Sequence, residues 1–105
     1  MPDAFDIGRL EARATEVAGT LRAMGNGRRL MMLCRLVEHG EVSVGALAEM
    51  LGLSQSAMSQ HLAKLRDEGL VAFRRDGQTL HYRIADDRVA SLIGALYRLY
   101  CTGTG

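Results

Sequence analysis

Apolar residues recur at alternating spacings of three and four along the first part of the chain. They are Ile7, Leu10, Ala14, Val17, Leu21 and Met24, and most of the charged side chains of this stretch lie between them. This spacing places the apolar side chains on one face of an α-helix. The pattern therefore predicts one amphipathic helix over residues 7–24, which the Gly25-Asn26-Gly27 break ends.

Three shorter helices are predicted next, because small polar residues precede apolar stripes and glycines follow them. They are a helix over 27–39 after Asn26, a short helix after Ser43, and a fourth helix after Ser54 that runs to about Glu68. The two helices that follow the serines are joined by a short turn containing Gly52. Two short helices with such a turn are typical of a helix-turn-helix.

After Gly69 the apolar period changes from 3.6 to two, which is typical of strands. Residues 70–73 and 79–84 are predicted to pair as a β-hairpin, with Asp76-Gly77 in the turn. A final helix over about 86–101 is expected to bury Val89, Leu92, Ile93, Leu96 and Leu99 or Tyr100. The expected fold is mainly α with a small hairpin, in the order ααααββα.

Composition limits the class of protein. The 105 residues, 48% of them hydrophobic, suit one compact domain over 1–105, and the net charge of +1 is too small for a disordered chain. We expect residues 1–6 and 102–105 to be flexible. No apolar stretch is long enough to span a membrane, and the acidic N-terminus lacks the plan of a secretory signal, so we expect a cytoplasmic protein.

The outer face of the fourth helix has the composition of a DNA-reading surface. On a helical wheel Gln55, Ser56, Ser59, Gln60 and Ala63 lie together, opposite Met58, Leu62 and Leu65. The outer face carries no carboxylate, and Lys64 lies on its flank. Amides and hydroxyls bond base edges in the major groove, whereas carboxylates are repelled by phosphates. The alternative is an exposed helix that these polar side chains merely solvate.

The hairpin adds a second candidate DNA contact. Arg74 and Arg75 precede its turn and Gln78 follows it, and arginines on such a ribbon suit the DNA backbone or minor groove. Ser43 and Ser54 begin helices whose free N–H groups favour phosphate oxygens. The alternative for the hairpin is an edge protected by charge. The predicted DNA-binding residues are Ser43, Ser54, Gln55, Ser56, Ser59, Gln60, Lys64, Arg74, Arg75 and Gln78.

Several motifs resemble the ArsR family of dimeric winged-helix repressors across residues 17–101. The most specific is the run from Leu53-Ser-Gln-Ser to Gly69-Leu-Val, and Arg74-Arg-Asp-Gly-Gln agrees with it. The resemblance implies a homodimer joined through its first and last helices. It also implies that the fourth helix is the recognition helix and the hairpin the wing. The expected partner is a palindromic double-stranded DNA operator with half-sites about one helical turn, or a multiple, apart.

The chain has two cysteines, Cys34 on a helix stripe and Cys101 at the end of the last helix. Their positions resemble an ArsR subgroup that responds to reactive sulfur species. The resemblance implies that persulfides or polysulfides oxidise the two thiols to a di- or polysulfide bridge, which releases DNA. Taken alone, Cys34 also fits a small buried apolar residue.

Other uses of the cysteines remain open. The two thiols suit a soft ion such as Cu(I) or trivalent arsenic, or a general oxidant, whereas His39, His61 and His81 lie on different elements without ligand spacing. We expect no cofactor and no dedicated metal site. A thiol peroxidase is the alternative from another class, although no base near a nucleophile is recognisable, and we expect no catalytic residues and no enzyme activity.

Overall fold

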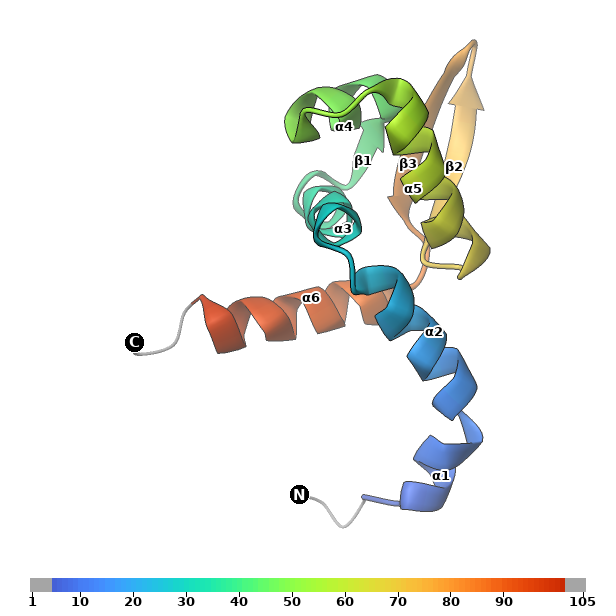
Figure 1. The fold of residues 1–105 in the computed structure, drawn as a ribbon, viewed down its shortest axis with the longest axis vertical. Coiled ribbons are helices and arrows are strands. Elements are labelled where there is room, and N and C mark those ends of the chain that lie inside the picture. The colour runs from blue at the N-terminus through green and yellow to red at the C-terminus, as the bar shows by residue number, and fades with distance from the viewer. Residues whose placement is uncertain (1–4, 102–105) are drawn as a thin grey trace.

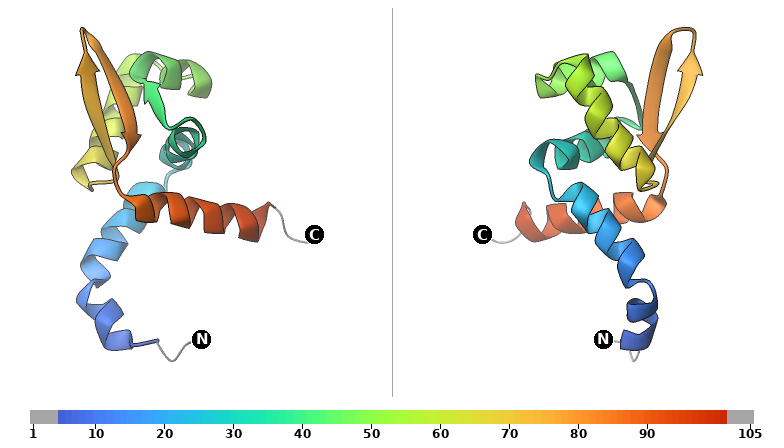
Figure 2. Two further views of the ribbon diagram at one scale, coloured as in Figure 1. Left: turned by 180° about the vertical axis from the view of Figure 1, so that it is seen from behind. Right: turned by 45° about the vertical axis from the view of Figure 1, so that its right-hand side comes forward.

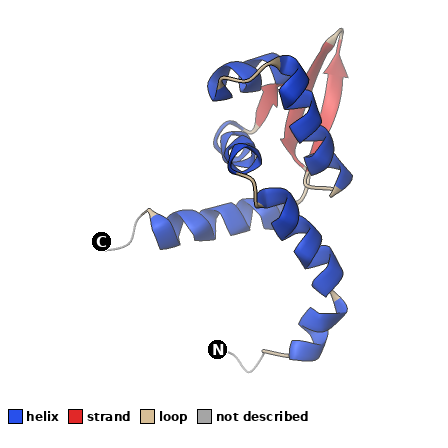
Figure 3. Cartoon of the chain, viewed as in Figure 1, coloured by secondary structure: helices blue, strands red, loops and turns tan. Residues whose placement is uncertain are grey.

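Six helices and three short strands make up residues 5–101, the part of the chain that the computed structural model describes (Figures 1 and 3). In chain order they are α1 (Ile7–Ala12), α2 (Ala14–Met24), α3 (Gly27–His39), β1 (Glu41–Ser43), α4 (Val44–Leu51), α5 (Gln55–Asp67), β2 (Val71–Asp76), β3 (Thr79–Ile84) and α6 (Asp87–Tyr100). The predicted fold class, mainly helical with a helix-turn-helix and a hairpin wing, is confirmed.

The N-caps that the sequence predicts are formed as hydrogen bonds. Ser43 Oγ accepts from the backbone N–H of Ala46, and Ser54 Oγ accepts from that of Ala57, each at 3.1 Å. Asn26 accepts from the first two N–H groups that follow Gly27 in α3, at 3.0 and 3.1 Å. These side chains satisfy N–H groups that the first helical turn leaves without a partner, so each helix begins at a defined residue.

Two details differ from the predicted elements. The single helix expected over 7–24 is interrupted at Arg13, whose backbone (φ −109°, ψ 8°) leaves the helical conformation and caps α1. The Arg13 guanidinium turns to Glu16, with Nη2 2.6 Å from Oε1. The apolar spacing continues across this interruption, so periodicity alone could not reveal it. Strand β1 was not predicted either.

The sheet is antiparallel, with the strand order β1-β3-β2. Tyr82 in β3 lies between Val42 of β1 and Phe73 of β2, and its ring centroid is 5.4 Å from that of Phe73. The β2–β3 turn contains Gly77, whose φ of 64° is a conformation that favours glycine. Strand β2 extends beyond the predicted residues 70–73 and includes Arg74 and Arg75, which precede the turn as expected.

The core lies around α3, which packs against α2, α4, α5 and α6 as well as β1 and β3. The side chains that are almost completely buried come mostly from α3 to β3: Met32, Leu33, Leu36, Leu47, Met58, Leu62, Leu65, Leu70, Val71 and Val89. Helices α4 and α5 pack against each other and against α3, so the helix-turn-helix is held on the core by its apolar face.

Helices α1, α2 and α6 project from this core as two arms (Figures 1 and 2). The radius of gyration is 15.3 Å, against about 13 Å for a compact domain of this length. Leu99 and Tyr100, which the sequence pattern expected to be buried, are 74% and 82% exposed. That expectation is wrong for a single chain, because the end of α6 extends past the core.

The expected flexible termini, residues 1–6 and 102–105, fall mostly outside the described residues; of them only Phe5 and Asp6 are described. Within residues 5–101, none of the helices has the length and hydropathy needed to cross a bilayer.

Candidate DNA interface and thiol pocket

The two faces of α5 separate as the helical wheel predicts. Met58, Leu62 and Leu65 have no exposed surface, and they fix the helix on the core. The opposite face is exposed: Gln55, Ser56, Ser59, Gln60 and Lys64. Ala63 is half-buried on the same side. This face therefore presents hydroxyls, amides and one ammonium group to solvent on a rigidly supported helix.

The C-terminal end of α5 is fixed against the wing by a cation–π contact. The guanidinium carbon of Arg66 lies 5.4 Å from the centroid of the Phe73 ring, and Phe73 in turn packs on Tyr82. These side chains therefore link the end of α5 to the hairpin.

All of the predicted wing residues are exposed, but one of them already has a partner. Arg74 binds Glu41 of β1 through both ends of its fork: Nε lies 3.1 and 3.0 Å from the two carboxylate oxygens, and Nη2 lies 2.9 Å from Oε1. The pKa of the Glu41 carboxyl is lowered, chiefly by its hydrogen bonds from Arg74. Arg75 and Gln78 are exposed at the end of the hairpin.

The serines that were predicted to contact phosphate are both helix N-caps. Ser43 is half-buried and Ser54 is exposed, and each hydroxyl oxygen accepts from its own helix. Their remaining hydroxyl protons are the groups that each serine can still offer to an anion.

The structure brings the two cysteines to one pocket. Cys34 is half-buried on α3, and Cys101 is exposed directly after α6. Both line a pocket of about 780 Å³ between α3 and α6. Its other lining residues are mostly apolar: Leu30, Met31, Arg35, Val37, Glu38, Ile93, Gly94, Leu96, Tyr97 and Tyr100. Two thiols far apart in the sequence therefore lie at one site.

The surroundings of Cys34 disfavour its thiolate. Burial raises the pKa of the Cys34 thiol, and the neighbouring Cys101 raises it further, while the Arg35 charge acts in the opposite direction. Arg35 Nη1 also donates to Glu38 at 3.1 Å. Because the thiolate is the nucleophile, this environment disfavours the reactive form of Cys34.

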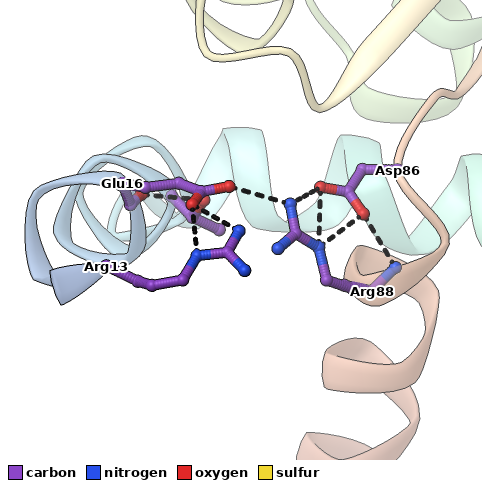
Figure 4. A network of polar contacts seen from close by, with 5 residues as sticks. Arg13, Glu16, Asp86 and Arg88 are labelled. Atoms are coloured by element: carbon purple, nitrogen blue, oxygen red, sulfur yellow. Dashed lines mark hydrogen bonds and ion pairs between the residues drawn. The ribbon is translucent and has the colours of Figure 1, made fainter. Parts of the chain in front are cut away.

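A polar network joins the two arms where they leave the core (Figure 4). The Arg88 guanidinium of α6 donates to Glu16 of α2 at 3.0 Å and to Asp86 at 2.7 Å, and Arg13 binds the same Glu16. The pKa of the Glu16 carboxyl is lowered by Arg13 and then by Arg88, and that of Asp86 is lowered by Arg88. We call these four residues the arm clasp. Neither the clasp nor the role of Glu41 was predicted from the sequence.

No group of three or more His, Cys, Asp or Glu side chains within residues 5–101 is arranged to hold a metal ion. His39, His61 and His81 lie on α3, α5 and β3 respectively.

The fold and the exposed helix define a winged helix-turn-helix protein, and comparisons with known proteins agree. Residues 26–72 match the model of the arsR family of bacterial regulatory proteins. The chain is 45% identical to the transcriptional activator HlyU of Vibrio cholerae over 92% of this chain and 89% of that protein. It is 43% identical to the biofilm growth-associated repressor of Xylella fastidiosa over 89% of this chain and 81% of that protein.

Solved structures give the same result. Reduced HlyU from V. cholerae superposes with a TM-score of 0.81 at 46% identity, covering 89% of this chain and 97% of that one. The repressor BigR from X. fastidiosa gives 0.85 at 40% identity, covering 92% and 98%. A homodimeric winged helix-turn-helix domain from Mycobacterium bovis gives 0.78 at 36% identity, covering 94% and 89%. The chain therefore belongs to the ArsR family and is a transcriptional regulator rather than an enzyme.

Proposed function

We propose that this chain is a homodimeric repressor of the cytoplasm that leaves its palindromic operator when Cys34 and Cys101 are bridged by sulfur. The observation that carries the proposal is that both thiols line one pocket between α3 and α6. The inducer is an organic persulfide or polysulfide.

The proposed reaction requires no cofactor. Deprotonated Cys101, the more exposed thiol, attacks the outer sulfur of a persulfide RSSH, forms Cys101–S–SH and releases the thiolate RS⁻. Deprotonated Cys34 then attacks the inner sulfur, which forms the disulfide and releases HS⁻. The two cysteines are oxidised by two electrons, and the persulfide is reduced to thiol and sulfide. A further sulfur atom transferred from a second persulfide before closure gives a trisulfide.

The bridge would act on DNA binding through α3. It ties the end of α6 to α3, and α3 packs against both α4 and α5, the helix that carries most of the proposed DNA-binding face. A changed angle between α6 and α3 alters how two recognition helices are spaced in a dimer. A coupling of about 1–3 kcal/mol, ordinary for allostery, would weaken operator binding by up to about a hundredfold.

The arms supply the proposed dimer interface. Their exposed apolar side chains are Ile7, Leu10, Val17 and Leu21 on α1 and α2, and Tyr97, Leu99 and Tyr100 on α6. An apolar surface of this extent on a small protein marks an interaction site. A second copy of the chain is the occupant that fits, because a twofold axis buries equivalent helices against each other and the M. bovis relative is homodimeric.

The proposed DNA contacts divide between base reading and phosphate binding. Gln55 and Gln60 read base edges in the major groove, and replacing either with Ala is expected to cost about 1–3 kcal/mol and relax base preference. Ser56 and Ser59 lie beside them on the exposed face. The remaining proposed contacts, to the backbone, are Ser43, Ser54, Lys64, Arg75 and Gln78, together with Arg74 when it is released from Glu41.

The test uses an operator selected from a random duplex library with the reduced protein. Reduced protein is treated separately with glutathione persulfide, hydrogen peroxide and oxidised glutathione, and its intact mass and operator affinity are then recorded. We expect a Cys34–Cys101 bridge, with or without added sulfur, after the persulfide alone, together with weaker binding. Arsenite and Cu(I) treatments separate a soft-ion sensor, which would lose affinity without any oxidation.

The matched controls are the variants Cys34→Ser and Cys101→Ser. Each is expected to bind the operator like the reduced protein and to keep its affinity after persulfide treatment. The redox mechanism would be overturned if glutathione persulfide, hydrogen peroxide and oxidised glutathione all left the mass of the protein unchanged. It would also be overturned if both variants were still released from the operator by the persulfide.

A further inference from the structure

The two neighbouring arginines of the wing lie on opposite faces of the sheet. Successive residues of a strand alternate between the two faces of a sheet. Arg75 therefore lies on the same face as Phe73, and Arg74 lies on the opposite face. The Phe73 face is the one that contacts α5, through Arg66. Arg75 therefore lies on the side of the ribbon that carries the recognition helix, and Arg74 does not.

Arg74 and Glu41 come from the two outer strands of the sheet, with β3 between them (Figure 2). Glu41 is in register with Arg83 of β3, and Arg74 is in register with His81. These four residues occupy one face, and the Glu41 carboxylate reaches across β3 to the Arg74 fork at 2.9–3.1 Å. The pair joins residues 33 positions apart, so the tertiary fold creates it.

The geometry of this pair matches that of a guanidinium on a DNA phosphate. A planar guanidinium binds carboxylate and phosphate oxygens in the same two-pronged manner. Glu41 thus engages Nε and Nη2, two adjacent donors that Arg74 would offer to the backbone, and its negative charge offsets the charge that Arg74 would add to the wing. Both side chains are substantially exposed, so the pair is accessible to solvent and salt.

We infer that Glu41 holds Arg74 away from DNA and thereby limits the affinity of the wing, which leaves Arg75 as its main phosphate-binding residue. The inference rests on the proposed DNA-binding function. Glu41 acts as a positioning residue, because it acts on DNA through Arg74.

The experiment measures affinity against salt concentration for the reduced protein and a mixed-sequence duplex about three helical turns long. Each neutralised phosphate contributes about −0.9 to the slope of log affinity against log salt, or roughly fivefold in affinity at physiological salt. For each protomer, Arg75→Gln is expected to make the slope shallower by that amount, and Arg74→Gln to change it little. Glu41→Gln is expected to make the slope steeper by about the same amount per protomer, because Arg74 is freed to bind a phosphate.

A double-variant comparison separates this pairing from a general charge effect. In the Arg74→Gln background, the further change Glu41→Gln is expected to alter neither affinity nor slope. Glu49→Gln on α4, an exposed carboxylate, is the charge-matched control and should act equally in both backgrounds. The inference would be overturned if Glu41→Gln strengthened DNA binding equally in the presence and absence of Arg74. It would also be overturned if Arg74→Gln alone made the salt slope as shallow as Arg75→Gln does. If the unmodified protein binds neither this duplex nor an operator, the proposed function itself fails.

Discussion

The helices of the winged core and of the projecting arms share the same spacing of apolar residues, but the two regions differ in how far those residues are buried. From α3 to β3 the apolar stripes meet one another, and ten side chains, counting Val89 of α6, are almost completely buried. On α1, on α2 before Met24 and at the end of α6 the stripes stay exposed, although their spacing is as regular. The core is therefore stabilised by its own packing, whereas the exposed apolar side chains of the arms form the proposed dimer interface. The thiol pocket lies where α6 leaves α3, between these two regions.

The largest effect is expected in the core. Leu62→Ala removes a fully buried side chain of α5 and leaves a cavity, which should lower the free energy of unfolding by about 2–5 kcal/mol. Because the packing that this change removes lies within one chain, the decrease should be the same at low and high protein concentration. Urea unfolding at two protein concentrations measures it. A decrease below about 1 kcal/mol would contradict the self-sufficient core.

A smaller effect, and one of a different kind, is expected in the arms. Leu99→Ala should leave the core intact and raise the dimer dissociation constant about thirtyfold, because about 1 kcal/mol is removed in each of two symmetric copies. Sedimentation at several concentrations measures the shift. Met50→Ala on α4, also an exposed apolar position, is the matched control and should not alter dimerisation. Equal dissociation of both variants would remove the distinction between arm and core.

The sequence predicts the core elements closely because their ends are fixed locally. The side chains of Asn26, Ser43 and Ser54 each accept a hydrogen bond from a backbone N–H no more than three residues further along the chain. Gly52, in the left-handed conformation, ends α4 at its predicted place. The faces of α5 follow from the helical period alone. The interruption at Arg13 and the three-residue strand β1 were missed, because no Gly or Pro marks the first and the second depends on pairing with a distant strand.

The candidate site was predictable to a lesser degree. The exposed polar face of α5 could be predicted from its own residues. The pairing of the two cysteines was predicted only from a family resemblance, since no local rule joins positions so far apart. The Glu41–Arg74 ion pair had no signal in the sequence, because it depends on the register of three strands. Leu99 and Tyr100 were expected to be buried, since periodicity shows an apolar face without showing what covers it.

The smallest effect is expected at the arm clasp, where core and arms meet. Arg88→Gln removes the ion pairs to Glu16 and Asp86, which are exposed and therefore weak, so Tm should fall by less than about 4 °C at neutral pH. Arg13 and Arg88 hold the pKa of Glu16 below its ordinary value of 4.5, and Arg88 holds that of Asp86 below 3.8. Their contribution is therefore present above those values and is lost as the pH falls through the lowered ones. Thermal melts of the variant and the unmodified protein should converge as the pH falls below 3.8 and through the lowered pKa values of Glu16 and Asp86, and Arg22→Gln, an exposed arginine on α2, should show no such convergence. A Tm difference that stays constant down to pH 2 would show that Arg88 acts by packing rather than by charge.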